Sequence, residues 1–383
     1  MRGLKIAHVT STFPPYEGGI GNVCLHQARS LSERGHTVTV FVPQANKTEK
    51  RTYYPFTVKY VKPIFSVGNA SFIPSLRGAL HGFDIIHLHY PFFGGDIFVR
   101  WAARKYDIPY VMTYHVDISG DTILRKTIFF LYNRLFRKKM IDDSKKVLAL
   151  TDAHIRNSQI STMKCLAEKI EVVPNGVLLS DFLGVYERRK LRNNYGIPES
   201  AAVVCFIGAL DRAHFYKRLD LLIETVPLLR EEAYLLVIGD GDMRHTYEKL
   251  AKRLGLLQRI IFVGGVMNSK IARYLDACDL LVLPSDNESF GMVIIEAFAV
   301  KKPVVVSNLP ALASVVHDGV DGLLFEQGNK SQLSEKINSL ISNKAYAQKM
   351  GKAGYEKVRT QYTWNLIAEQ LENIYASVIN NAG

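Results

Sequence analysis

The chain has 383 residues, 48% of them apolar and 22% charged, which is ordinary for a soluble globular protein with room for two or three domains. It has no run of eighteen apolar residues and only a short apolar stretch at its start, so the sequence predicts neither a transmembrane helix nor a signal peptide. Its four cysteines are scattered without metal-ligand spacing, which predicts buried thiols in a reducing cytoplasm.

The positive charge is concentrated in the first half of the chain. Residues 1–185 contain 24 Lys and Arg against 14 Asp and Glu, a balance of +10 out of a total of +12. The remaining residues contain 24 basic and 22 acidic side chains. An acidic partner is therefore expected for the first half: a membrane surface, a lipid phosphate or nucleic acid.

The chain opens with a predicted βαβ unit, a strand over 5–10, a Gly-rich loop and a helix over 23–34, followed by a strand over 37–42. The loop is not a dinucleotide fingerprint, because Cys24 stands where a third small residue is wanted and no acid closes the second strand. A nicotinamide dehydrogenase is therefore disfavoured. A plain strand-to-helix turn remains an alternative to a ligand-binding loop.

Further strands of the first half are predicted over 84–89, 109–117, 146–151 and 170–177. His89 and His115 lie at the carboxyl ends of two of them, where open α/β sheets bind their ligands. Core histidines are the alternative interpretation.

Residues 121–146 alternate aromatic and apolar side chains with many Lys and Arg, as in Ile128-Phe129-Phe130-Leu131 and Arg137-Lys138-Lys139. Such a pattern is typical of a helix at a membrane interface. A core-packed helix with a solvated basic side fits the same pattern.

After a polar crossing segment, a second α/β unit begins near residue 200. Its first strand, over 203–208, leads into a loop in which Arg212 and Lys217 can neutralise a diphosphate. Asp240 and Asp242 are interpreted as a turn, and Arg244 as a donor contact or a surface residue. The other strands are predicted over 234–238, 260–265, 279–284, 302–307 and 319–325.

The stretch Ser285–Phe298 joins a buried strand to an apolar helix, which Ser285, Asn287 or Ser289 is expected to cap. Gly291 allows a ligand to approach the free N–H groups of the helix start. Glu288 lies in the loop and Glu296 in the helix. An anion cradle flanked by two carboxylates suits a sugar nucleotide, whereas a capped surface helix with two solvated glutamates is the plainer alternative.

This stretch resembles the Glu-x7-Glu element of family 4 glycosyltransferases, which are retaining enzymes of the GT-B fold. The resemblance covers nearly the whole chain and departs from the family at Ala209, where an Arg is usual, so that Arg212 would have to take its place. It implies catalytic roles for His115, Glu288, Arg212 and Lys217. The donor-binding residues that it implies are Gly19, Gly208, Arg212, Lys217, Gly239, Val266, Glu288, Phe290, Gly291, Met292 and Glu296, and on the acceptor side Gly18, Gly21, His89 and His115.

The sequence thus predicts an α/β protein of the GT-B fold, with two Rossmann-like domains facing each other across a cleft. These are an acceptor domain over 1–185 and a donor domain over 186–362, with a helix over 363–383 that crosses back to the first. The expected reaction is retaining transfer of a hexose, such as mannose or glucose, from a nucleotide sugar to a glycolipid or cell-envelope glycan precursor. No cofactor, no metal and no nucleic acid are expected.

The expected location is the cytoplasm, on the inner face of the membrane if the basic helix is interfacial. Two alternatives stay open from the sequence. One is a sugar-nucleotide epimerase of the same fold, and the other is a non-catalytic protein that binds nucleotide sugars.

Overall fold

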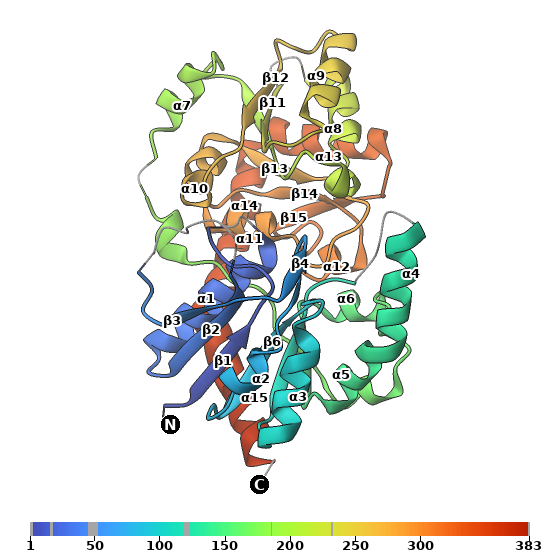
Figure 1. Cartoon of the computed structure of the whole chain (residues 1–383). Coiled ribbons are helices and arrows are strands. Elements are labelled where there is room, and N and C mark those ends of the chain that lie inside the picture. The colour runs from blue at the N-terminus through green and yellow to red at the C-terminus, as the bar shows by residue number, and fades with distance from the viewer. Residues whose placement is uncertain are drawn as a thin grey trace. The chain divides into compact units, whose positions relative to one another are not determined.

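The computed structural model describes residues 3–15, 18–44, 53–117, 123–184, 186–230 and 233–381. The chain forms two compact units, one made of Met1–Asn175 with Trp364–Gly383 and the other of Gly176–Thr363 (Figure 1). The sequence places these boundaries at residues 185 and 362. Among the described residues, no helix combines the length and the apolar character that crossing a bilayer requires.

The first unit contains a sheet of seven parallel strands in the order β3-β2-β1-β6-β7-β8-β9. Its central strands are apolar runs that are buried along their whole length, as is usual for a parallel sheet covered on both faces. A separate antiparallel hairpin is formed by β4 and β5. The strands are β1 (Lys5–Val9), β2 (Thr37–Pro43), β3 (Thr57–Val61), β4 (Phe65–Val67), β5 (Ala70–Phe72), β6 (Ile85–Tyr90), β7 (Tyr110–Tyr114), β8 (Lys146–Ala149) and β9 (Ile170–Val172).

The helices of the first unit include the last helix of the chain, α15, which packs against α1. The rings of His26 and Trp364 stack at 5.2 Å, and the Glu372 carboxylate binds Arg34 at 2.6 Å and His36 at 2.8 Å. The helices are α1 (Gly19–Glu33), α2 (Leu76–Ala79), α3 (Asp96–Tyr106), α4 (Ile123–Tyr132), a π-helix η1 (Asn133–Arg137), α5 (Lys138–Asp143), α6 (Asp152–Arg156) and α15 (Trp364–Asn380).

The second unit contains six parallel strands in the order β12-β11-β10-β13-β14-β15. The strands are β10 (Ala202–Ile207), β11 (Ala233–Ile238), β12 (Ile260–Gly264), β13 (Leu280–Leu283), β14 (Val304–Ser307) and β15 (Gly322–Phe325). The helices are α7 (Arg188–Asn194), a 3-10 helix η4 (Arg212–Lys217), α8 (Leu219–Thr225), α9 (Arg244–Arg253), α10 (Asn268–Ala277), α11 (Met292–Ala299), α12 (Pro310–Ala313), α13 (Lys330–Ser342) and α14 (Lys344–Gln361).

Helix α14 packs closely against α11 and the residues that follow it, because two glycines of α14 leave room there. A Cβ atom on Gly351 would lie 1.9 Å from the carbonyl oxygen of Lys301, and one on Gly354 would lie 2.3 Å from the ring of Phe298. Both glycines therefore permit a close helix contact, which fixes the orientation of α11.

Each sheet has a point at which the strand order reverses, between β1 and β6 in the first unit and between β10 and β13 in the second. Ligands of open α/β sheets bind at the carboxyl ends of the strands beside such a point. The prediction of two Rossmann-like α/β domains is confirmed, and the reversal points indicate where each unit presents its functional residues.

Candidate functional site

In the second unit, the segment after β10 directs Lys217 back toward the carboxyl edge of the sheet. The Asp211 side chain accepts a hydrogen bond from the His214 N–H and begins η4, whose last residue is Lys217. A Cβ atom on Gly208 would lie 2.8 Å from Cδ of Lys217. Glycine at position 208 therefore leaves the room through which the lysine side chain runs.

Lys217 meets Glu288 from the loop after β13. The Nζ atom lies 3.7 Å from Oε1 of Glu288, and the two side chains are 17% and 12% exposed. The Ser285 hydroxyl donates to the same carboxylate oxygen at 3.4 Å. The two loops that flank the reversal point therefore bring one cation and one carboxylate together in a largely enclosed place.

Glu296, in the second turn of α11, is the third member of this group. Burial raises its pKa to about 7, and the positive charge of Lys217 opposes that rise. A carboxylate among apolar neighbours is costly unless an opposite charge lies nearby, and Lys217 supplies such a charge. The structure thus assembles Lys217, Glu288 and Glu296, three residues that the sequence singled out.

The start of α11 differs from the sequence-based expectation. Its N-cap is Gly291, in a left-handed conformation with φ 80°, so the expectation that Ser285, Asn287 or Ser289 is the N-cap is wrong. The first turn of a helix carries N–H groups without intrahelical partners, which can bind an anion. Phe290 is 2% exposed and packs against Tyr362, so it offers a ligand its backbone and little of its ring. Met292, the first helical residue, is partly buried.

Arg212 and Arg244 make their contacts with other groups. Arg212 is 86% exposed and lies 3.7 Å from Asp242, whose carboxylate also accepts from the Arg212 backbone N–H at 3.0 Å. Arg244 binds Glu248 at 2.8 Å and approaches Asp240 at 3.5 Å. The carboxylates of Asp240 and Asp242 are therefore ion-pair partners of Arg244 and Arg212.

Two other predicted donor residues lie at strand ends of the same sheet. A Cβ atom on Gly239 would lie 1.8 Å from the carbonyl oxygen of Gly208, so the backbone itself requires glycine there. Val266 is partly buried in the loop after β12.

Sequence reasoning missed Arg218 and Tyr216, which fix the shape of the site. Arg218 binds Asp220 at 3.1 Å and Asp286 at 2.9 Å, and the Tyr216 carbonyl accepts from the Asp286 N–H at 2.7 Å. The loop that carries Glu288 is thereby fastened to the segment that carries Lys217. The sequence held only a weak signal for this, the short spacing of Arg218 and Asp220.

The raised pKa of Glu296 predicts a pH-dependent stability. Between its ordinary pKa of 4.5 and the folded value of about 7, the folded state binds more protons than the unfolded state, so stability falls as pH rises through this window. The fall is at most about 3.5 kcal/mol at about 1.4 kcal/mol per pKa unit, and less because the side chain is partly exposed. Glu296→Gln should therefore stabilise the protein more at pH 8 than at pH 5 in urea unfolding. Equal effects at both pH values would contradict the raised pKa.

In the first unit, four histidines gather near the point where the strand order reverses. His89 lies in β6 and His115 directly follows β7, as the sequence indicates, and His8 of β1 joins them. The Nδ1 atom of His8 lies 2.9 Å from Nε2 of His89, and Nδ1 of His89 lies 3.1 Å from Nε2 of His115. His87 binds the Tyr375 hydroxyl at 2.6 Å and the Thr113 hydroxyl at 2.7 Å.

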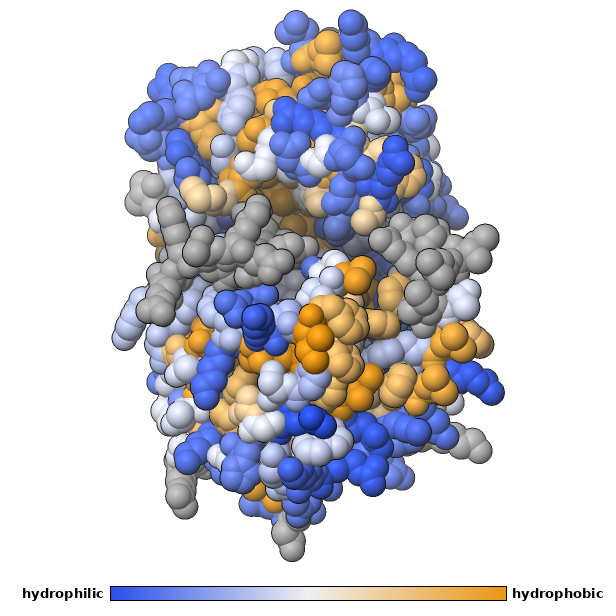
Figure 2. Space-filling model, in the orientation of Figure 1, coloured by the Kyte–Doolittle hydropathy of each residue, from blue (hydrophilic) through white to orange (hydrophobic). Residues whose placement is uncertain are grey.

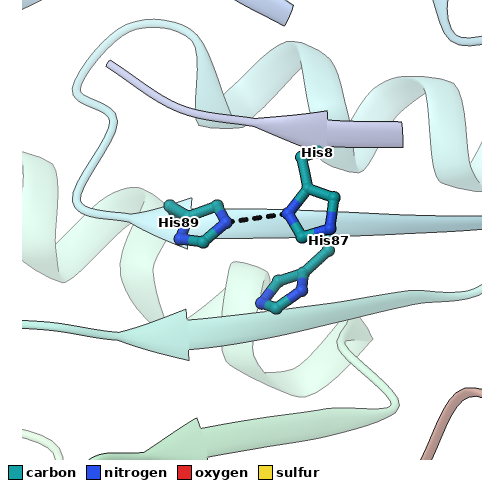
Figure 3. Close-up of side chains that lie close together, drawn as sticks. All are labelled: His8, His87 and His89. Carbon is teal, nitrogen blue, oxygen red and sulfur yellow. Dashed lines mark hydrogen bonds between the residues drawn. The ribbon is translucent and has the colours of Figure 1, made fainter. Parts of the chain in front are cut away.

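All four rings are buried, and burial lowers the pKa of each, to about 3 for His8 and His115 and well below the usual value for His87 and His89. The rings are therefore neutral at pH 7. His8, His87 and His89 each have a nitrogen within 4.8 Å of the others, which is a donor set that Zn²⁺ accepts (Figure 3). However, every ring nitrogen of these three except Nε2 of His8 already has a hydrogen-bond partner, so a metal would have to displace those bonds.

The glycines of the first loop lie at the start of α1, which begins four residues earlier than the sequence suggests. Gly18 is the N-cap and Gly19 the first helical residue. A Cβ atom on Gly21 would lie 2.8 Å from the carbonyl oxygen of Thr12, so this glycine allows α1 to pack closely on the preceding loop. At Gly19, no atom of the described residues lies within 4 Å of such a position.

Comparison with known proteins gives two family models that together span most of the chain. The model for Glycosyltransferase Family 4 matches residues 17–181, and the model for Glycosyl transferases group 1 matches residues 187–357. An uncharacterised glycosyltransferase of Methanocaldococcus jannaschii is 26% identical, with 99% of this chain and 100% of that protein covered. The phosphatidyl-myo-inositol mannosyltransferase of Mycobacterium leprae is 26% identical, with 94% and 93% covered.

Solved structures agree with this match in their fold. Anabaena HepE in complex with UDP-glucose superposes with a TM-score of 0.77 at 20% identity, covering 98% of this chain and 100% of that chain. The GT-B fold that the sequence predicts is confirmed.

Proposed function

Because the chain belongs to the group 1 and family 4 glycosyltransferases, we propose that it transfers a hexose, such as mannose or glucose, from a nucleotide sugar with retention at the anomeric carbon. The observation that carries this proposal is the position of Lys217, whose Nζ lies 3.7 Å from Glu288 and whose charge acts on Glu296. A nucleotide sugar has an anionic diphosphate between two groups rich in hydroxyls. The site offers a cation, the N-terminus of a helix and two carboxylates, which match those parts.

Each residue of the site has a role in this proposal. Lys217 and the N–H groups at the start of α11 stabilise the charge that develops on the leaving diphosphate. Glu288 binds hydroxyls of the transferred sugar, and Glu296 binds the ribose. The acceptor hydroxyl attacks from the face that the diphosphate leaves, and its proton passes to the leaving phosphate. These groups stabilise the negative charge of the leaving diphosphate, so the proposal requires no metal ion.

The acceptor is proposed to be a glycolipid or cell-envelope glycan precursor that binds the basic first unit. Two observations support this: the +10 balance of residues 1–185, and the similarity to a protein named phosphatidyl-myo-inositol mannosyltransferase. The donor is proposed from the site geometry, and HepE, whose fold is similar, is described in complex with UDP-glucose.

The function is tested by incubating the purified protein with UDP-, GDP- and ADP-sugars in the presence of a bacterial or archaeal lipid extract. Release of nucleoside diphosphate that depends on the extract, together with a sugar-labelled lipid, is the expected result. The anomeric configuration of the product, read by NMR, tests retention. A sugar nucleotide that is epimerised without any acceptor would instead support the epimerase alternative.

The basic helical segment of the first unit is proposed to lie on an anionic membrane surface. Phe129 and Tyr132 pack inward against Phe93. On the outside, Phe130, Leu131 and Leu135 are 63%, 49% and 54% exposed. Arg134, Lys138 and Lys139 are exposed beside them. Figure 2 shows apolar and hydrophilic residues mixed on the face that carries α4.

Arg137 is an exception within this segment. It is partly buried and donates to Gln159 at 2.6 Å, so it does not belong to the exposed cations that the sequence suggests.

We expect the protein to bind anionic vesicles, and we expect its affinity for them to fall as the salt concentration rises. Salt at 0.1 M screens charges that are more than roughly 10 Å apart. Replacing Arg134, Lys138 and Lys139 with glutamine should weaken vesicle binding in a sedimentation assay while nucleotide affinity stays the same. The matched control neutralises three exposed cations of α9 in the second unit, Lys249, Lys252 and Arg253. Equal binding of the parent to neutral and anionic vesicles would contradict the proposal that this segment binds an anionic membrane. An equal loss of vesicle binding in the two triple variants would contradict it as well.

A further inference from the structure

Three histidines of the first unit form a hydrogen-bonded row that begins inside the sheet and ends at its carboxyl edge. His8, His89 and His115 are linked by two N···N bonds, each of which joins Nδ1 of one ring to Nε2 of the next. Figure 3 shows the first bond, between rings carried by the neighbouring strands β1 and β6. His8 and His89 are fully buried and His115 is 6% exposed, so no solvent competes for the two bonds.

This connectivity restricts the protonation of the row. A neutral imidazole carries one N–H, so it donates from one nitrogen and accepts at the other. His89 uses both nitrogens, and it must donate in one bond and accept in the other. If His89 donates from Nδ1, it accepts from Nδ1 of His8 and donates to Nε2 of His115, so all three rings carry the proton on Nδ1. If His89 donates from Nε2, the same reasoning puts the proton of all three rings on Nε2.

The two ends of the row decide which nitrogen this is. With the protons on Nε2, His8 would bury an N–H that has no acceptor among the described residues. A buried donor without a partner is rarer in proteins than an acceptor without one. With the protons on Nδ1, the unused N–H belongs to His115, which directly follows β7 and is the one ring of the three with any exposed surface, so a ligand can accept from it.

We infer that His8 and His89 are positioning residues that hold His115 in its Nδ1–H tautomer, so that it presents a neutral N–H donor to a substrate oxygen at the carboxyl edge of the first sheet. The inference rests on the transferase function proposed above. It adds His8, a residue remote from the strand ends, to the groups that determine the rate.

The neutrality of the row suits this role. Burial lowers the pKa of His8 and His115 to about 3 and that of His89 well below its usual value. In glycosyl transfer the sugar ring becomes electron-poor as the bond to the leaving group breaks. A neutral donor can orient a substrate hydroxyl without adding a positive charge, which such a ring would oppose. His87 stacks on His89 at 4.6 Å but bonds to Tyr375 and Thr113, so it lies outside the row.

The tautomer is measured directly by ¹⁵N NMR of the protein labelled in its histidine rings, at pH 7, because protonated and bare ring nitrogens have well-separated shifts. We expect protonated Nδ1 in His8, His89 and His115 alike. Protonated Nε2 in His115, or different tautomers among the three rings, would overturn the inference.

A kinetic experiment tests the positioning role. His8→Leu breaks the row, whereas His8→Asn keeps an amide donor near the position of Nδ1. We expect His8→Leu to lower kcat for the sugar nucleotide that the parent uses fastest by about tenfold, with the dissociation constant of its nucleoside diphosphate unchanged. His8→Asn should restore most of the rate.

His87→Leu is the matched control, because it removes a buried imidazole of the same cluster that is not part of the row. An equal loss of kcat in His8→Leu and His87→Leu would show that packing alone is affected, and would overturn the positioning role. If the parent turned over no sugar nucleotide, the proposed function would fail, while the NMR result would still decide whether the row sets the tautomer of His115.

Discussion

Replacing Lys217 with alanine is expected to weaken the binding of a nucleoside diphosphate by about 1.5–3 kcal/mol, roughly 10- to 100-fold in the dissociation constant. In the free protein the lysine lies 3.7 Å from Glu288 in a largely enclosed place, and its positive charge also acts on Glu296. A bound diphosphate would gain a charge-assisted contact with Nζ, and the alanine variant would leave the phosphates facing the carboxylates alone. Calorimetric titration with UDP and with GDP measures the change.

Arg212→Ala is the natural comparison, because this arginine lies five positions earlier and is highly exposed beside Asp242. Its effect should be much smaller than that of Lys217→Ala. Gly208→Ala provides an independent route to the same site, since the added Cβ would lie 2.8 Å from Cδ of Lys217 and displace that flexible side chain. It should weaken nucleotide binding with little loss of folding stability. An unchanged affinity for nucleoside diphosphate in both the Lys217 and the Gly208 variants would show that the diphosphate does not bind at Lys217.

Glu288→Gln and Glu296→Gln are expected to separate binding from turnover. Glu296 is assigned to the ribose, which the free nucleotide and the intact donor share, so Glu296→Gln should weaken both by similar amounts. Glu288 is assigned to the transferred sugar, which the free nucleotide lacks. Glu288→Gln should therefore lower kcat about 100-fold, as the loss of a transition-state contact does, while the nucleoside diphosphate binds at least as well, because Lys217 loses a competing carboxylate.

Each variant is a matched control for the other, because both replace a glutamate near Lys217 with an amide of equal size. Calorimetry with nucleoside diphosphate and a transfer assay on the same preparations give the two readouts. Full activity in Glu288→Gln, or undiminished nucleotide affinity in Glu296→Gln, would show that these glutamates do not have the assigned roles.

The motif at 285–298 could be predicted from the sequence because its geometry is local. An apolar run ending in Pro284, a polar loop with Gly291 and an apolar helix place two glutamates on either side of a helix start, whatever the rest of the chain does. The strand-by-strand alternation of both halves was readable for the same reason. The N-cap was predicted less well, because Ser, Asn and Gly all favour that position. Only the backbone conformation, with Gly291 at φ 80°, identifies the residue that occupies it.

The sequence by itself determined that the chain is an α/β protein and that its first half is basic, and it singled out Lys217, Glu288 and Glu296 as candidates for a site that takes an anionic, hydroxyl-rich ligand. Only the tertiary structure decided which cation faces the glutamates, because the short helix η4 turns Lys217 toward Glu288 and leaves Arg212 with Asp242. The histidine row was likewise a matter of strand order and register. His8 pairs in register with His87 across β1 and β6, and His89 with Thr113 across β6 and β7, which sets His8 and His115 on either side of His89. Residues 81 and 26 positions apart meet there because parallel strands bring distant segments together, and no local pattern in the chain records that pairing.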